Sequence, residues 1–244
     1  MPTPPGGRLA RMTHTAVVRA AALAGWVGPD QLTAVLYRSG GTAPDPREDP
    51  RLPRFLADRA ERSVAGVLEG YDRSRTEHWN GWTAPGTDTS MQVHKVYVSP
   101  TLPSLPAALP VVFAAAVALE VPSWKVGADT AGLHRPDKVV LYLPSAQRAD
   151  QCAALLADAL AGLDAQGVPF TGQVGATGIV SRGRDQGRQS WRAVMCRAVA
   201  EALVDRRLVL GPHAPHRQVA DDALASLAPA VDVATWQPET RVPA

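Results

Sequence analysis

The sequence has few of the residues that disulfide frameworks and metal sites need. Only two cysteines occur among the 244 residues, Cys152 and Cys196, and both stand in alanine-rich segments with a helical pattern. We therefore expect two buried, reduced thiols and a reducing compartment rather than a disulfide. No cysteine or carboxylate stands at metal-ligand spacing from His78, or from the pair His213 and His216, which argues against a zinc site.

The sequence also has no apolar run long enough to span a membrane and no strong net charge. The longest apolar stretch, 105–119, is short and contains Pro106 and Pro110. Arg19 interrupts the apolar residues near the N-terminus and no small-residue cleavage site follows, so we expect no signal peptide. A net charge of +2 gives no reason to expect nucleic acid as a partner. Together these absences predict a soluble cytoplasmic protein with no membrane partner.

Several catalytic motifs are missing as well. The chain has no G-K-[ST] phosphate loop, no G-x-S-x-G elbow, no dinucleotide fingerprint and no H-E-x-x-H. No metal or organic cofactor is therefore expected. An anion that binds this protein is expected to be a phosphate attached to its substrate rather than a nucleotide.

What is present predicts an α+β fold in three segments. Residues 1–12 are rich in proline and glycine and are expected to be disordered. Residues 13–75 are expected to form a small helical lobe, followed over 76–244 by a mixed β-sheet flanked by helices. Three aromatic residues of the first part are expected in the core: Trp26, Tyr37 and Phe55.

Within these segments, periodicity predicts the individual elements. Helical spacing is found at 13–26, 29–37, 52–71, 107–119, 146–163, 191–203 and 219–227. Alternation or β-branched residues predict strands at 91–99, 123–126 and 138–143, with an extended piece at 168–170. Segment 76–90 is rich in turn residues, and 172–187 holds five glycines without a helical period.

Lys125 stands inside an apolar, strand-like run. Burial beside other cations should lower the pKa of this lysine, which would make it a usable general base. The alternative is an edge-strand lysine whose ammonium group reaches water. In the preceding strand, period two places Lys95 and Tyr97 on one face and His94 on the other.

Further cations could bind an anion together with these lysines. The arginine fork matches phosphate oxygens, and a helix N-terminus near Ser190 favours an anion further. The cations are Arg135, Lys138, Arg182, Arg184, Arg188 and Arg192.

Several short motifs follow one another along the chain: K-x-Y at 95–97, W-K-V at 124–126, R-P-D followed by V-L-Y-L at 135–143, V-P-F-T at 168–171, and S-W-x-x-x-x-C-R at 190–197. Their order resembles the Hop-type type III effector-like lyases, which accompany kinase-like partners in class V lanthipeptide and thioamitide biosynthesis. The first three motifs are also similar to the phosphothreonine lyase effectors. Because the resemblance covers roughly residues 90–205, it marks the 76–244 domain as lyase-like.

This resemblance implies β-elimination of phosphate from phosphoserine or phosphothreonine in a ribosomally made precursor peptide. The product would be dehydroalanine or dehydrobutyrine, and a separate kinase-like protein would be a partner. By position, Lys125 matches the general base and Lys95 matches a cation beside the phosphate. Tyr97 stands where phosphothreonine lyases have a histidine general acid, and a tyrosine of ordinary pKa is a weaker acid near neutrality.

Three ways of protonating the leaving group stay open on the sequence. Neighbouring cations could lower the pKa of Tyr97, His94 or Lys95 could act as the acid, or phosphate could leave without much protonation. The resemblance makes Arg135 and Arg182 the first candidates to bind phosphate, with Lys138, Arg184 and Arg192 as further candidates. An alternative function is a non-catalytic protein that binds a leader or phosphopeptide for a modifying kinase or cyclase complex, which would need the arginines but no buried lysine.

Overall fold

The computed structural model describes residues 7–44, 47–64, 68–89, 92–185, 189–228, 231–232 and 236–238. The α-helices are α1 (Arg8–Ala21), α2 (Pro29–Arg38), α3 (Leu52–Arg62), α4 (Leu105–Ala118), α5 (Thr130–His134), α6 (Ala146–Ala159), α7 (Trp191–Leu210) and α8 (His216–Leu227), with a 3-10 turn at Leu68–Gly70. The strands are β1 (Asp72–Arg75), β2 (Trp79–Thr83), β3 (His94–Val98), β4 (Ser123–Gly127), β5 (Val139–Leu143), β6 (Gly172–Val174), β7 (Val180–Arg184), β8 (Val231–Asp232) and β9 (Gln237–Pro238).

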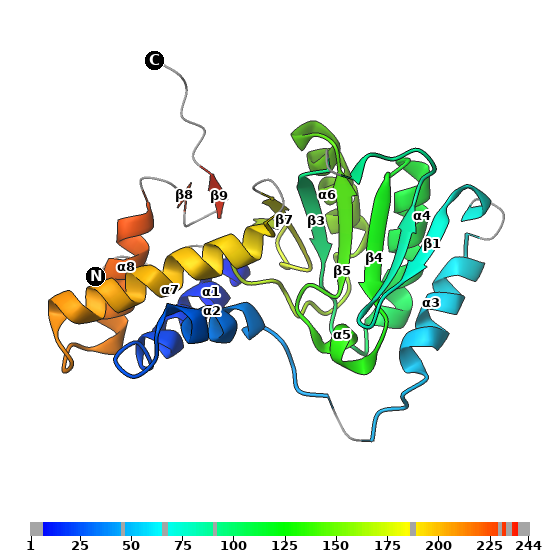
Figure 1. Ribbon diagram of the computed structural model, residues 1–244. Coiled ribbons are helices and arrows are strands. Elements are labelled where there is room, and N and C mark those ends of the chain that lie inside the picture. Colours follow the sequence, from blue (N-terminus) through cyan, green and yellow to red (C-terminus); the bar gives the residue numbers. More distant parts are fainter. Residues whose placement is uncertain are drawn as a thin grey trace, which may run out of the picture.

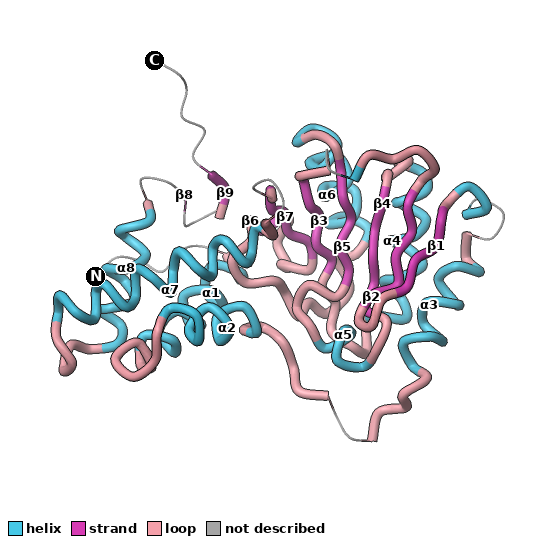
Figure 2. Tube along the Cα trace, viewed as in Figure 1, coloured by secondary structure: helices cyan, strands magenta, loops and turns pink. Residues whose placement is uncertain are grey.

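Seven strands form the central sheet in the order β1-β2-β4-β5-β3-β7-β6. Every neighbouring pair is antiparallel, which confirms the α+β class and makes the sheet antiparallel where a mixed one was expected. Helix α4 connects β3 to β4, and β5 lies between these two strands. This connection therefore crosses over β5 (Figures 1 and 2).

One face of the sheet is apolar and covered by helices. Val96, Trp124 and Leu141 lie in the main hydrophobic core together with side chains of α3, α4 and α6. Trp124 stacks beside Trp82, with ring centroids 6.0 Å apart. Alternation along each strand then turns the intervening residues to the opposite face, where the candidate site lies.

A second hydrophobic cluster joins the two ends of the chain. Helices α1 and α2 pack with α7 and α8 around Val17, Leu36 and Val199, whereas α3 packs on α4 beside the sheet (Figure 1). The first three helices therefore do not pack as one lobe. Helix α1 also begins at Arg8, inside the segment expected to be disordered. Residues 1–6 lie outside the described residues.

Several sequence expectations fail where strands are short and polar. The turn-rich segment contains β2, which forms a hairpin with β1 at the end of the expected helical lobe, and the glycine-rich segment forms the hairpin of β6 and β7. Neither hairpin shows a regular apolar alternation, so neither was predicted.

Three aromatic residues also differ from the sequence expectation. Phe170, expected in an extended piece, has a left-handed φ of 63°. Trp26 and Phe55, expected in the core, are 86% and 54% exposed.

Two further observations concern disulfide-bonded and membrane-spanning proteins, the two classes that the sequence argues against. Cys152 and Cys196 are both free and buried, as expected. Across the part of the chain that the structure describes, no helix has the length and apolarity to cross a membrane.

A glycine allows the start of α7 to approach the face of the sheet that is not covered by the main core. A Cβ at Gly183 in β7 would lie 2.8 Å from Cδ1 of Trp191 and 3.1 Å from Cε2 of Tyr97. The first contact is closer than real Cβ atoms make and the second is tighter than most of them, so a larger residue would push the start of α7 away from β3.

Candidate active site

The candidate site lies on the face of the sheet opposite the main core. The strand register places Lys125 opposite Val140 and Val140 opposite Tyr97, so one row runs from β4 across β5 to β3. In the next row, Tyr142 lies opposite Lys95. The expectation that Lys95 and Tyr97 lie on the same face of the sheet is confirmed, and Lys125 lies on that face as well.

The amine of Lys125 is enclosed by aromatic rings. Its Nζ lies 3.9 Å from the ring centroid of Trp79 and 5.7 Å from that of Tyr142. Among the described residues, no carboxylate and no hydrogen-bond acceptor holds this amine. Burial, followed by the positive charge of Lys95, lowers the pKa of Lys125 from 10.5 to about 8. About a tenth of the amine is therefore neutral at pH 7 and about half at pH 8, which is the form that a general base requires.

Lys95 is fixed by Asp185, which follows β7. Its Nζ lies 2.5 Å from Oδ2 of this carboxylate, and Oδ1 accepts a hydrogen bond from the backbone N–H of Trp191. Asp185 therefore joins Lys95 to the first turn of α7. Ser190 stands at the N-cap of this helix, and its side chain makes no capping hydrogen bond.

Tyr97 is buried, and its hydroxyl has no hydrogen-bond partner among the described residues. Burial, with the negative charge of Asp185 nearby, holds the pKa of Tyr97 well above its usual value. The expectation that neighbouring cations could lower this pKa is therefore wrong. His94 cannot replace it either, because period two turns His94 to the opposite face, beside Arg184 and Arg182.

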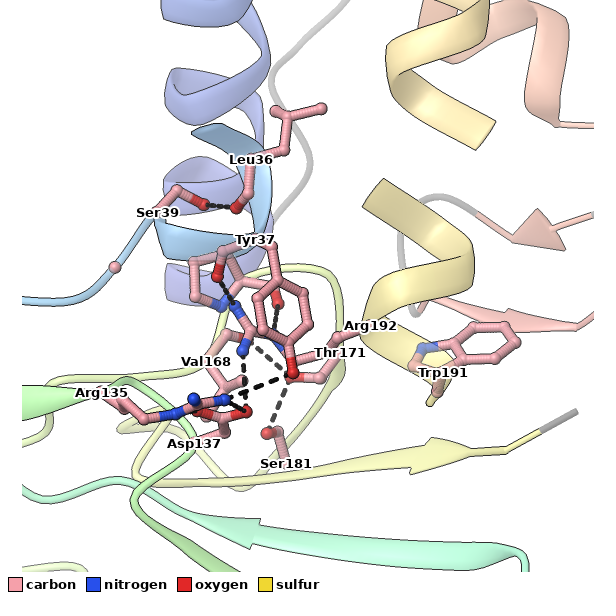
Figure 3. A network of polar contacts seen from close by, with 12 residues as sticks. Leu36, Tyr37, Ser39, Arg135, Asp137, Val168, Thr171, Ser181, Trp191 and Arg192 are labelled. Atoms are coloured by element: carbon pink, nitrogen blue, oxygen red, sulfur yellow. Dashed lines mark hydrogen bonds and ion pairs between the residues drawn. The ribbon is translucent and has the colours of Figure 1, made fainter. Parts of the chain in front are cut away.

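Arg135 follows α5 and is held at the edge of the site by Asp137. Its Nε and Nη2 donate to the two carboxylate oxygens at 2.9 and 3.1 Å, and Nη2 also donates to the hydroxyl of Tyr37 (Figure 3). The guanidinium carbon lies 5.1 Å from the ring centroid of Trp79, the same ring that contacts Lys125. Among the described residues, Nη1 of Arg135 has no hydrogen-bond acceptor or ionic partner, which leaves it able to bind an anion.

Two expected phosphate-binding residues lie on the wrong face. Arg182 pairs with Val96 in the register, so its side chain points to the helix-covered face and forms an ion pair with Asp150 of α6. Arg184 follows with the same parity and is exposed. Neither can reach the face that carries Lys125. Arg188 lies outside the described residues.

Two more expected residues are occupied by structural contacts. Lys138 is fully buried, and its Nζ donates to the carbonyl of Pro100 and to the side chain of Gln166. Arg192 is 1% exposed; it pairs with Asp137 and donates to the carbonyl of Tyr37. The charged groups of both residues are therefore occupied by contacts within the protein and are not available to bind a phosphate.

A cavity of about 620 Å³ is lined by Arg135 but not by Lys95 or Lys125. Its walls are the end of α2 with the segment that follows, α5, and the turn after α5. His134 fixes one wall, because its ring nitrogens contact Thr42 Oγ1 at 2.6 Å and Glu48 Oε2 at 2.7 Å. The described residues include no group of three or more histidine, cysteine, aspartate or glutamate side chains that could hold a metal.

Sequence reasoning missed the residues that position the cations. Asp137 and Asp185 were present in the motifs at 135–137 and 172–187, but no role was assigned to them. Tyr142 and Trp79, which enclose the lysine, were read as a strand residue and a turn residue. A buried lysine or arginine that stays charged is costly without a partner, so a search for carboxylates near each candidate cation could have found both aspartates.

Neither family models nor curated proteins provide a match for this chain. Solved structures of two effector proteins from Pseudomonas syringae do share its fold. An effector protein from Pseudomonas syringae pv. syringae strain 61 has a TM-score of 0.56 and 14% identity, covering 96% of this chain and 100% of that one. An effector protein from Pseudomonas syringae pv. tomato strain DC3000 has a TM-score of 0.56 and 12% identity, covering 92% and 96%.

A weaker likeness involves the type III effector/phosphothreonine lyase OspF from Shigella flexneri. Its TM-score is 0.40 at 12% identity, covering 70% of this chain and 97% of that one. The two P. syringae proteins therefore establish a shared fold only, and the match to OspF carries no argument about activity.

Proposed function

We propose that this protein is a phosphoserine or phosphothreonine lyase that eliminates phosphate from a ribosomally made precursor peptide, in lanthipeptide-type biosynthesis. The observation that carries the proposal is the amine of Lys125. It is partly buried, its pKa is lowered to about 8, and no acidic partner among the described residues holds it. Two other cations, Lys95 and Arg135, lie around the same aromatic rings.

In the proposed reaction, the neutral amine of Lys125 takes the Cα proton of the phosphorylated residue. The electron pair of that C–H bond forms the Cα–Cβ double bond, and the Cβ–O bond to phosphate breaks. The positive charges of Lys95 and Arg135 stabilise the charge that develops on the enolate and on the phosphate. The product is a dehydroalanine or dehydrobutyrine residue and inorganic phosphate.

Of the acids left open by the sequence, Lys95 is the one that the proposal uses. Its ammonium lies on the same face as Lys125 and is fixed by Asp185. Tyr97 keeps its proton because its pKa is raised, so it acts as a neutral hydrogen-bond donor rather than a proton source. The buried, unpaired hydroxyl would then gain a partner in the bound substrate.

The test is to incubate the protein with synthetic phosphothreonine and phosphoserine peptides and to follow them by mass spectrometry. We expect loss of phosphoric acid with the wild type and no loss with Lys125→Met. Arg182→Gln is the matched control, because this cation lies on the opposite face and should leave the rate unchanged. Binding of intact phosphopeptide by the wild type without elimination would instead favour the non-catalytic leader- or phosphopeptide-binding function.

A further inference from the structure

A second cavity, of about 870 Å³, lies along α1 and is lined by four arginines. They are Arg8, Arg11, Arg19 and Arg38, and all four are exposed. Among the described residues, no aspartate or glutamate lines this groove. We refer to it as the arginine groove.

The arrangement of these arginines is not explained by stability. Positions 8, 11 and 19 recur on one face of α1, so their charges point into the same volume. Arg8 and Arg11 lie in the first turn, where the helix dipole disfavours positive charge, and no acidic residue offsets them there. Arg8 donates to the carbonyl of Ala165, whereas Arg11, Arg19 and Arg38 form no ion pair within the described residues.

The arginine groove adjoins the cavity at the candidate site. Arg38 and Gly41 line both cavities, and the site cavity ends at Arg135 and Asp137. A ligand bound at Arg135 could therefore extend past the end of α2 onto α1. From Arg8 to Arg19 the helix rises by about 16 Å. That length matches roughly five residues of extended peptide.

We propose that the arginine groove binds an acidic segment of the same peptide whose phosphorylated residue reaches Lys125. The inference rests on the proposed function, since it assigns the groove to the substrate of that site. A run of carboxylates complements the arginines in charge and in hydrogen-bonding geometry. A peptide fits better than a nucleic acid, because the proposed function places a peptide residue in the neighbouring site and the chain has a net charge of only +2.

The test uses two synthetic phosphothreonine peptides that differ only in a flank of about five glutamates or five glutamines. The flank is placed on either side of the phosphothreonine, because the direction of the peptide is not assumed. Affinity is measured by fluorescence anisotropy on the full chain carrying Lys125→Met, which prevents turnover. The probes for other occupants are an oligodeoxythymidine strand and anionic phosphatidylserine vesicles.

We expect Arg11→Glu/Arg19→Glu to weaken binding of the glutamate-flanked peptide about tenfold and to leave the glutamine-flanked peptide unaffected. The milder variant Arg11→Gln/Arg19→Gln should show a smaller loss, so that a folding defect is not mistaken for lost contacts. The matched control is Arg59→Glu/Arg62→Glu, with the same charge change on exposed positions of α3. It should leave both affinities unchanged.

Several outcomes overturn the inference. These are equal affinity for the two peptides, an equal loss in the α3 control, or tighter binding of the oligonucleotide or vesicles that depends on Arg11 and Arg19. Elimination by the otherwise wild-type protein separates the two proposals. Elimination without a preference for the glutamate flank supports the proposed lyase activity and contradicts the proposed role of the arginine groove. A preference for the glutamate flank in binding, without any elimination, supports the role of the groove and contradicts the lyase activity.

Discussion

At the scale of single residues, Lys125 and Lys138 show why a lowered pKa alone does not identify a catalytic base. Burial lowers the pKa of Lys125 to about 8 and that of Lys138 to about 7. Lys138 nevertheless donates to the carbonyl of Pro100 and to Gln166 and is fully buried. Lys125 has no such partners among the described residues. The difference in partners, rather than in pKa, assigns the base.

The pKa of Lys125 predicts the pH dependence of the reaction. Because only the neutral amine takes a proton, the elimination rate should rise with pH and level off above about pH 8. Below that value the rate should fall about tenfold for each pH unit. Initial rates measured above pH 7, where the substrate phosphate is already a dianion, check this expectation. A rate that decreases as pH rises from 7 to 8 would contradict the base assignment.

Replacement of Tyr97 by phenylalanine separates stability from activity. The hydroxyl is buried without a protein partner, so Tyr97→Phe should leave the free energy of unfolding unchanged or raise it by about 1 kcal/mol. If the hydroxyl binds the substrate, the elimination rate should fall by about tenfold. Urea unfolding and kcat are measured on the same preparation. A variant as active as the wild type would show that this hydroxyl takes no part.

At the scale of elements, the short helix α5 organises the site more than its length suggests. Gly132 packs against Gly127 of β4 so closely that a Cβ on Gly127 would lie 2.6 Å from the carbonyl carbon of Gly132. This contact fixes the turn that presents Arg135. On the other side, His134 connects α5 to the segment that follows α2 through Thr42 and Glu48. Helix α5 therefore joins the sheet to the wall of the site cavity.

We expect His134→Ala to loosen that wall. The variant loses both side-chain contacts of a buried histidine, which should cost about 1–3 kcal/mol and speed amide hydrogen exchange at residues 39–44. His14→Ala, which removes a contact with Asp221 at the far helices, is the control. It should leave exchange at 39–44 unchanged, and equal acceleration in both variants would rule out a local role for His134.

At the scale of the whole molecule, one carboxylate joins the helices to the sheet. Asp137, just before β5, contacts Arg135 after α5 and Arg192 in α7, and Arg192 also donates to the carbonyl of Tyr37 in α2 (Figure 3). The positive charges of Arg192 and Arg135 hold the pKa of Asp137 far below its usual value, although burial alone would raise it. The site thus lies where the helices and the sheet meet.

The low pKa of Asp137 predicts how stability depends on pH. A carboxyl group with a depressed pKa in the folded state stabilises the fold above its unfolded pKa, near 4, and loses that contribution as pH falls below it. Asp137→Asn should therefore cost about 3–5 kcal/mol at pH 7 and show a weaker acid dependence than the wild type. Urea unfolding between pH 3 and 7 measures both. Asp205→Asn, on an exposed position of α7, is the control and should change neither.

The sequence by itself determined the α+β class, most helices, three central strands and the placement of Lys95 and Tyr97 on the same face. These features follow from local periodicity, which places residues two apart on the same side of a strand. The same rule placed His94 on the other side. The two polar hairpins were not predictable in this way, because their strands are short and carry little apolar alternation.

Only the tertiary structure decided which cations share a face and which carboxylates hold them. Strand order and register put Lys125 in the row of Tyr97 but put Arg182 opposite Val96, on the covered face. Periodicity describes one strand at a time, whereas register depends on pairing between strands far apart in the chain. For the same reason, Asp185 and Asp137 could be assigned to Lys95 and Arg192 only once the fold had brought them together.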